Sequence, residues 1–367
     1  MTQSHSAGPA RRAATSGTGP APSPTQGGAA LRDAVWTAAA LAARLPADAW
    51  EVEAVSRRYR LRVPRPYLDL VAEPGDPIWR QSVPARAELE EAHLAEDPLA
   101  EDAPHNAPVP HLSHRYPDRA LLLVTDLCPM FCRFCMRKRK TLRGAAIDTA
   151  TVERAIAHIR ATPAIREVIV SGGDPLMLPD ARLDALLGEL RAVPHVEVLR
   201  VHTRMPCVEP RRVTAALARM LARHRPLFVG VHFNHPRELT PAAGRALALL
   251  ADAGLPLHSQ TVLLNGVNDD ARVLADLFRG LLRWRVHPYY LHHADLIPGT
   301  AHFRTSIQRG LGIVDELRRE APELAMLHYV LDTPGGGGKV PLTWPRPQGE
   351  PPAGPTRSGC ADPARRR

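Results

Sequence analysis

From residue 120 onward, short runs of aliphatic and β-branched residues alternate with stretches in which apolar side chains recur every three or four positions. The short runs are typical of buried strands, and the longer stretches are typical of amphipathic helices. We expect strands at residues 120–124, 167–171, 196–202, 227–232, 257–264 and 286–292. We expect helices at residues 149–161, 181–192, 212–223, 241–253, 269–283 and 306–320.

This alternation is the pattern of βα units, which build parallel sheets. Six strands in one series predict a partial (β/α)6 barrel that is open on one side, with a doubly wound sheet as the alternative. Around the barrel we expect a tail, a helical arm and a C-terminal segment, because composition changes at these points. The predicted organisation is tail 1–30, helical arm 31–112, barrel 113–300, C-terminal segment 301–345 and tail 346–367.

Composition narrows the class of protein. The 367-residue chain carries a formal net charge of +9 but shows no basic stripe or known nucleic-acid module, so nucleic acid is disfavoured as a partner. Five cysteines, an odd number with three clustered, argue against a secreted disulfide framework. The sequence has no apolar run of membrane-spanning length, and its start lacks the apolar core of a signal peptide. We therefore expect a cytoplasmic protein with no membrane partner.

Polar side chains follow every expected strand at its C-terminal end. In a barrel, this end carries the functional residues. In chain order these are Cys128, Cys132 and Cys135; Ser171 to Asp174; His202 to Arg204; His232, Asn234 and His235; Gln260; and His292, His293 and Asp295. Six polar strand ends in succession predict one shared pocket.

The first strand end carries three cysteines in a C-x3-C-x2-C pattern, Cys128, Cys132 and Cys135. Thiolates select zinc, copper(I) or iron–sulfur clusters. A structural zinc site needs a fourth ligand, and no second C-x2-C is present. Three cysteines can instead hold a cubane cluster with one iron open to a ligand. A zinc knuckle completed by a distant histidine, or three buried cysteines, is the alternative.

Two glycine-rich segments could approach ligands closely. The segment from Asp332 to Lys339 reads DTPGGGGK, but Val340 follows the lysine, so the phosphate-binding Walker pattern fails. A lysine on such a loop can reach into a pocket and bind a carbonyl cofactor covalently. In Ser171-Gly172-Gly173-Asp174, the glycines allow close approach of a ligand and the aspartate can accept from an ammonium group. The alternatives are a flexible surface loop and an Asp-capped turn, respectively.

Charged residues supply two further candidates. Arg115, Tyr116 and Arg119 form a basic-aromatic group before the first strand, and arginines suit bidentate phosphate contacts. A solvated loop is the alternative. Asp295 and Asp332 could together recognise a distal cation, or could merely stabilise their own turns.

The stretch HRYPDRALLLVTDLCPMFCRFCMRKR at residues 114–139 resembles the signature of the radical S-adenosylmethionine (radical SAM) superfamily, and more narrowly the lysine 2,3-aminomutase family. PGGGGK resembles the segment of that family whose lysine carries pyridoxal phosphate (PLP). LRVHTRMP at residues 199–206 is closer to the branch that makes β-lysine for modifying elongation factor P. The resemblance covers residues 64–342.

The resemblance implies an isomerase, a PLP-dependent amino acid 2,3-aminomutase that converts L-lysine to β-lysine. It implies a [4Fe–4S] cluster, S-adenosylmethionine and PLP as cofactors, and flavodoxin or ferredoxin as the electron donor. The same chemistry on arginine or glutamate stays open, as does a non-catalytic metal- or nucleic-acid-binding protein. The family's C-terminal zinc-binding cysteines are missing, so the resemblance does not imply a zinc-supported pairing of subunits, and a homo-oligomer is left open.

The resemblance also implies roles for individual residues. His292 stands where the family has a tyrosine near the cofactor. The expected ligands are Cys128, Cys132 and Cys135 for the cluster; Ser171, Gly172, Gly173, Asp174, His232 and Gln260 for S-adenosylmethionine; Lys339, Arg115, Tyr116 and Arg119 for PLP; and Arg137, Asp295 and Asp332 for the substrate. Of these, Lys339 is the expected catalytic residue.

Overall fold

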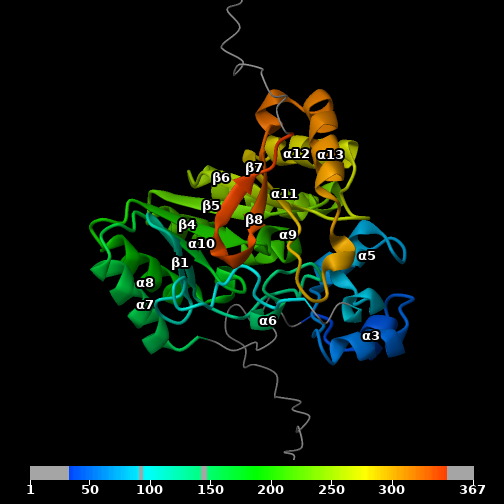
Figure 1. The fold of residues 1–367 in the computed structure, drawn as a ribbon, viewed down its shortest axis with the longest axis horizontal. Helices are drawn as coiled ribbons and strands as arrows, with labels where there is room; N and C mark the ends of the chain where they lie inside the picture. Colours follow the sequence, from blue (N-terminus) through cyan, green and yellow to red (C-terminus); the bar gives the residue numbers. More distant parts are fainter. Residues whose placement is uncertain (1–32, 91–93, 142–146, 345–367) are drawn as a thin grey trace, which may run out of the picture.

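The computed structural model describes residues 33–90, 94–141 and 147–344, so the expected tails, including Cys360, lie outside the described residues. One nine-stranded sheet forms the centre of the molecule, and its strands are ordered β1 to β9 as in the sequence (Figure 1). The strands are β1 (Leu112–Tyr116), β2 (Arg119–Leu123), β3 (Glu167–Ser171), β4 (Val198–Thr203), β5 (Leu227–His232), β6 (Leu257–Leu263), β7 (Val286–His293), β8 (His328–Thr333) and β9 (Gly338–Pro341).

Strands β2 to β8 run parallel, and β1 and β9 pair antiparallel at the two edges. The two edge strands approach each other, because the backbone N–H of Lys339 in β9 donates to the hydroxyl of Tyr116 in β1 at 2.8 Å. The sheet is therefore a nearly closed barrel. Its strands follow the sequence without the reversal of a doubly wound sheet, so the partial barrel is confirmed and the alternative is excluded.

Helices connect the parallel strands and bury one apolar side each. In α12, Leu274, Leu277, Phe278 and Leu281 recur at helical spacing and are all fully buried in the main core. Side chains of Asp148, Thr214, Thr240, Asp270 and Ser306 cap helix N-termini. The connecting helices are α7 (Thr149–Ala161), α8 (Asp180–Arg191), α9 (Met205–Val208), α10 (Ala215–Ala222), α11 (Pro241–Asp252), α12 (Ala271–Arg283) and α13 (Ile307–Glu320).

The N-terminal arm lies against one side of the barrel, where Figure 1 shows it in blue. Its Glu88 is buried and pairs with Arg133 at 2.6 Å and with Lys138 at 2.8 Å, both in or next to the cysteine loop. A buried carboxylate is tolerated only when paired in this way. The arm comprises α2 (Ala38–Ala42), α3 (Ala49–Ser56), α4 (Arg65–Leu68), α5 (Pro77–Ser82) and the 3-10 turn η1 (Arg86–Leu89), and α6 (Lys138–Thr141) follows the cysteine loop.

Three strands were not predicted. Strand β1 is largely polar, β8 mixes polar and apolar residues, and β9 contains glycine and proline, so none shows the apolar run of a buried strand. The expected helix at 212–223 begins later, at Ala215, because Pro210–Arg212 forms a separate 3-10 turn. The remaining 3-10 turns are η2 (Pro175–Met177), η4 (Pro236–Glu238), η5 (Ala301–Phe303), η6 (Glu323–Ala325) and η7 (Pro334–Gly336).

Within the part of the chain that the structure describes, no helix combines the length and apolar character needed to cross a membrane.

Candidate active site

The C-terminal ends of the parallel strands open into one cavity of about 310 Å³. Every residue predicted to bind a cluster, cofactor or substrate lines this cavity. The shared pocket predicted from the strand ends is therefore confirmed as a structural feature, although three of the predicted strand-end residues, Asn234, His235 and His293, are not among the residues that line it. The chemical role of each lining residue stays a prediction.

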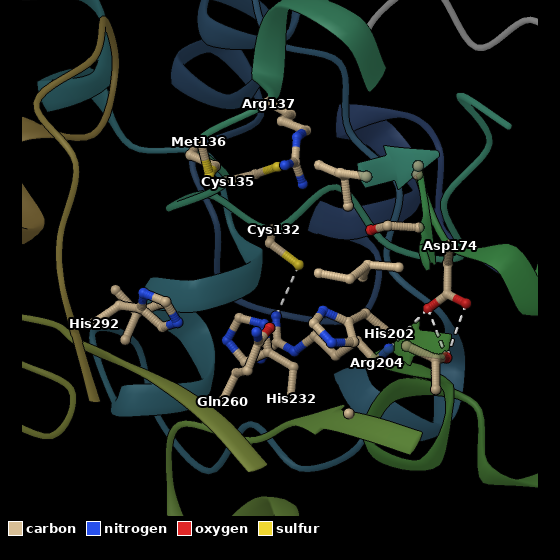
Figure 2. A pocket seen from close by; sticks show the side chains of 18 of the residues that line it. Cys132, Cys135, Met136, Arg137, Asp174, His202, Arg204, His232, Gln260 and His292 are labelled. Carbon is tan, nitrogen blue, oxygen red and sulfur yellow. Dashed lines mark hydrogen bonds between the residues drawn. The ribbon is translucent and has the colours of Figure 1, made fainter. Parts of the chain in front are cut away.

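The three cysteines lie in the loop between β2 and α6 and face the cavity, and none forms a disulfide. Figure 2 shows Cys132 and Cys135 on the same wall. Burial, followed by the neighbouring Cys132, raises the pKa of the Cys135 thiol to about 11. Since the thiolate is the form that binds metal, a positively charged metal group bound to these thiols would have to offset this cost of burial.

Gly172 and Gly173 hold the cysteine loop in place. A Cβ at Gly172, whose φ is +137°, would lie 2.3 Å from the carbonyl oxygen of Thr125, and one at Gly173 would lie 2.1 Å from that of Leu127. The amide of Gly173 also donates to the Thr125 carbonyl at 2.5 Å. The close approach that these glycines permit is thus to the backbone before Cys128, in addition to any ligand in the cavity.

Asp174 lines the cavity and also has hydrogen-bond partners within the protein. Its carboxylate is buried and accepts hydrogen bonds from the hydroxyl of Thr203 at 2.8 Å and from the amides of Arg204 and Leu176 at 2.8 and 3.0 Å. Burial raises the pKa of Asp174 to about 6 despite these bonds. The side chain caps the turn that follows β3 and fixes the end of β4, which is the alternative that the sequence also offered.

Arg204 donates a hydrogen bond to one of the cysteine sulfurs, although its sequence position indicated only a polar strand end. Its Nη1 donates to the Sγ of Cys132 at 2.8 Å, which Figure 2 shows as a dashed line. Its Nη2 donates to Glu238 and to Gln81, each at 2.8 Å. These partners come from the β5–α11 connection and from the N-terminal arm, so only the tertiary structure reveals the contact.

Lys339 lies on strand β9, and the expectation of a loop was wrong at this position. It is the register partner of Asp332 in β8, and its Nζ lies 3.1 Å from Asp332 Oδ2. His292 Nδ1 and Arg115 Nη2 lie 3.7 and 3.9 Å from the same carboxylate. Burial would raise the pKa of Asp332, but His292 and Lys339 together hold it well below its usual range. Asp332 is therefore a carboxylate surrounded by cationic and imidazole groups.

The predicted phosphate ligands lie beside Lys339. The hydroxyl of Tyr116 accepts from the Lys339 amide, and the Arg119 guanidinium stacks on the Tyr116 ring at 4.5 Å. Gly338 has a φ of +90°, and a Cβ at this position would lie 3.0 Å from the Tyr116 hydroxyl oxygen. A glycine is therefore required here. The glycine-rich segment thus brings the lysine next to the arginines.

Arg137 pairs with one acid, Glu101, and lies near a second, Asp295. Its Nη2 and Nε donate to the two oxygens of Glu101 at 2.6 and 3.1 Å, and Glu101 is a buried residue of the N-terminal arm that the sequence did not single out. Burial and the nearby Asp332 raise the pKa of Asp295, which also lines the cavity, to about 7. The predicted substrate ligands Arg137, Asp295 and Asp332 thus line the same cavity, and Glu101 adds a fourth charged residue to them.

Comparisons with known proteins agree with this geometry. Residues 122–278 match the model of the Radical SAM superfamily. The chain is 43% identical to L-lysine 2,3-aminomutase of Acetoanaerobium sticklandii, covering 85% of this chain and 77% of that protein. It is 42% identical to L-lysine 2,3-aminomutase of Clostridium subterminale, over 85% of this chain and 76% of that protein. The chain belongs to the L-lysine 2,3-aminomutase family. Glutamate 2,3-aminomutase of Clostridioides difficile is also similar, with 38% identity over a region that covers 79% of this chain and 69% of that protein.

Membership in this family makes the protein a radical SAM isomerase that works with a [4Fe–4S] cluster and S-adenosylmethionine. The residues present fit these groups. Three thiols converge on the cavity, and the buried Nε of Arg204 and Nε2 of His202 have no hydrogen-bond partner among the described residues. Buried polar atoms without partners at a cavity wall indicate that a ligand supplies the missing contacts.

Proposed function

We propose that this aminomutase acts on L-lysine and moves its amino group from Cα to Cβ, giving β-lysine, with PLP bound to Lys339. The observation that carries the proposal is the contact between Lys339 Nζ and Asp332 at 3.1 Å. It places a primary alkylammonium against a buried carboxylate at the cavity wall, and the ε-ammonium of a lysine substrate is the same chemical group.

PLP fits the wall formed by β1, β2 and β9. Lys339 would hold its aldehyde carbon, and Arg115 and Arg119 would contact its phosphate, with Tyr116 between them. All four residues line the cavity, and the hydrogen bond from the Lys339 amide to Tyr116 fixes the two strands relative to each other. Two arginines beside a lysine form a dianion site of the kind that a phosphate ester requires.

The substrate ligands would be Arg137 for the α-carboxylate and Asp295 with Asp332 for the ε-ammonium. Glu101 adds a third acid to this part of the cavity. A substrate with a second carboxylate, such as glutamate, would place like charges together in a buried site, which is unfavourable. The arrangement therefore favours a dibasic amino acid over an acidic one.

When bound, the cluster with S-adenosylmethionine supplies the radical that removes and returns a β-hydrogen, and PLP carries the migrating nitrogen. The residues of this chain would bind and orient the substrate and cofactors and would exclude water from the cavity. Asp295 and Asp332 would fix the far end of the substrate while Arg137 fixes its carboxylate, so that the reacting carbons are held between them. Phe134, packed against Phe303 and His232, covers the cysteine side of the cavity.

The test is an anaerobic assay of the reconstituted protein with S-adenosylmethionine, PLP and dithionite, which replaces the flavodoxin or ferredoxin expected as physiological donor. Parallel reactions receive L-lysine, L-arginine or L-glutamate, and products are identified by mass spectrometry. We expect β-lysine as the main product. Preferential conversion of glutamate or arginine would overturn the substrate assignment, and absence of iron and sulfide from the purified protein would overturn the cluster assignment.

A further inference from the structure

Arg204 joins the cysteine loop to three other parts of the molecule. Its guanidinium contacts Cys132 through Nη1, and its Nη2 contacts Glu238, Gln81 and, at 3.3 Å, the hydroxyl of Tyr67. Its backbone amide donates to Asp174. The side chain is buried, with 8% of its area exposed. Both ends of Arg204 are therefore fixed, and its orientation toward the sulfur does not depend on solvent or on a flexible segment.

Glu238 is equally fixed. It is fully buried, and its Oε2 accepts from the amides of Asn234 and His235 at 2.6 and 3.1 Å while its Oε1 accepts from Arg204. An ion pair that served only to anchor α4 or the β5–α11 connection would need no contact with a cysteine. Here one nitrogen of the guanidinium pairs with the carboxylate and the other with Cys132 Sγ.

We propose that Arg204 is a positioning residue for the iron–sulfur cluster, which donates a hydrogen bond to the Cys132 ligand and raises the reduction potential of the cluster. This inference rests on Cys128, Cys132 and Cys135 holding the cluster, as in the proposed function. Arg204, which directly follows β4, would thus make the cluster easier to reduce.

The physical basis is the charge added on reduction. A one-electron donor converts the cluster from its 2+ to its 1+ state, and the added negative charge spreads onto the cysteine sulfurs. A hydrogen bond and a positive charge at one sulfur stabilise the reduced state more than the oxidised state, which raises the potential. The guanidinium is largely buried, so solvent screens its charge less than it would at the protein surface. Glu238 opposes the effect, because its negative charge lies 2.8 Å from the same guanidinium.

The experiment is a redox titration of the reconstituted full-length protein with dithionite as the electron donor, followed by electron paramagnetic resonance of the reduced cluster. We expect the midpoint potential of Arg204→Gln to shift to more negative values, with Arg204→Lys between it and the wild type. Glu238→Gln removes the opposing charge and should shift the potential in the positive direction. Two variants of one ion pair that move the potential in opposite directions cannot be explained by general loosening of the fold.

The matched control is Arg212→Gln. Arg212 is also a buried arginine, but it donates to the carbonyls of Leu176 and Leu178 and pairs with Asp180, and it has no hydrogen bond to a cysteine among the described residues. The midpoint potential of the cluster in Arg212→Gln should equal that of the wild type. If Arg204→Gln does not retain a cluster, Arg204→Lys and Glu238→Gln decide the question by the signs of their shifts. Unchanged potentials with a normal cluster overturn the inference alone, whereas a wild-type protein without a cluster overturns the proposed function.

Discussion

Glu101 and Arg137 form a buried ion pair in which Arg137 Nη2 lies 2.6 Å from Glu101 Oε1 and Arg137 Nε lies 3.1 Å from Oε2. The pair connects the N-terminal arm with the loop that follows Cys135. It fixes the plane of the guanidinium proposed to hold the substrate carboxylate. The arm therefore contributes to the active site although none of its residues was predicted to do so.

Replacing Glu101 by Gln should destabilise the protein at neutral pH. Burial would raise the pKa of Glu101, but Arg137 outweighs burial and lowers it to about 2. A carboxyl group with a depressed pKa stabilises the fold above its unfolded pKa, and this contribution is lost as pH falls from about 4.5 through about 2. We expect Glu101→Gln to lower the free energy of unfolding by about 3 kcal/mol at pH 7 and by clearly less at pH 3.

Denaturant unfolding of wild type and variant at the two pH values measures this difference. Glu153→Gln, at an exposed position of α7, serves as the control and should change the free energy by less than about 0.5 kcal/mol. An equal loss of stability at pH 7 and pH 3 in Glu101→Gln would show that the charge of Glu101 is not the cause.

Replacing Gly173 by Ala should reduce the iron content of the protein. The new methyl group would lie 2.1 Å from the carbonyl oxygen of Leu127, so the loop that carries Cys128 must move. Gly312→Ala in α13 is the matched control, because a Cβ there has no neighbour within 4 Å and alanine favours a helix by about 1 kcal/mol. Iron analysis after anaerobic reconstitution should show loss only in Gly173→Ala, and a full iron content there would contradict the assigned role of the glycine.

Lys339→Arg should abolish covalent attachment of PLP while retaining the positive charge beside Asp332. Treating the protein with PLP and borohydride fixes the cofactor on the lysine that binds it, and peptide mass spectrometry locates the added mass. We expect the label on Lys339 in the wild type and on no lysine in the variant. Lys140→Arg, which alters an ion pair with Asp102 instead, should leave the label at Lys339. A label on any other lysine in the wild type would refute the assignment.

Lysine binding should strengthen as pH rises through about 7. Burial, with a further contribution from Asp332, raises the pKa of Asp295 to about 7, and Lys339, Arg137 and Glu101 are the other charged groups near it. Only the ionised carboxylate attracts an ammonium, so we expect KM for L-lysine to fall about tenfold between pH 6 and pH 8. Asp295→Asn should bind lysine more weakly with no such pH dependence, and a pH dependence that survives in this variant must arise elsewhere.

The sequence predicted the parallel part of the barrel well. Strands β3 and β5 agree with the expected residues. Strands β6 and β7 differ by one residue at one end, and β2 and β4 differ by one or two residues at both ends. Most of the side chains of these strands are buried or only partly exposed, so their apolar runs are visible without knowledge of the fold. Strands β1 and β9 lie at the edges and carry the polar residues Arg115, Tyr116 and Lys339, and their pairing partners determine their conformation.

The site was predicted where function depends on local spacing, as in the three cysteines and the strand ends that line the cavity. It was not predicted where a residue depends on partners far along the chain. Arg204 meets Gln81, 123 positions away, and Glu101 meets Arg137, 36 positions away. The same holds for Asp174, whose carboxylate accepts hydrogen bonds from Thr203 and Arg204, about 30 positions further along the chain.

The central claim is that this chain moves the α-amino group of L-lysine to Cβ. The most direct measurement is anaerobic incubation with S-adenosylmethionine, PLP, dithionite and L-lysine labelled with 15N at the α-amino group and 13C at Cβ. Carbon and nitrogen NMR should then show a new one-bond coupling between the labelled nitrogen and Cβ, and Lys339→Ala should show none. Unchanged lysine in a wild-type sample that holds both its cluster and PLP would contradict the claim.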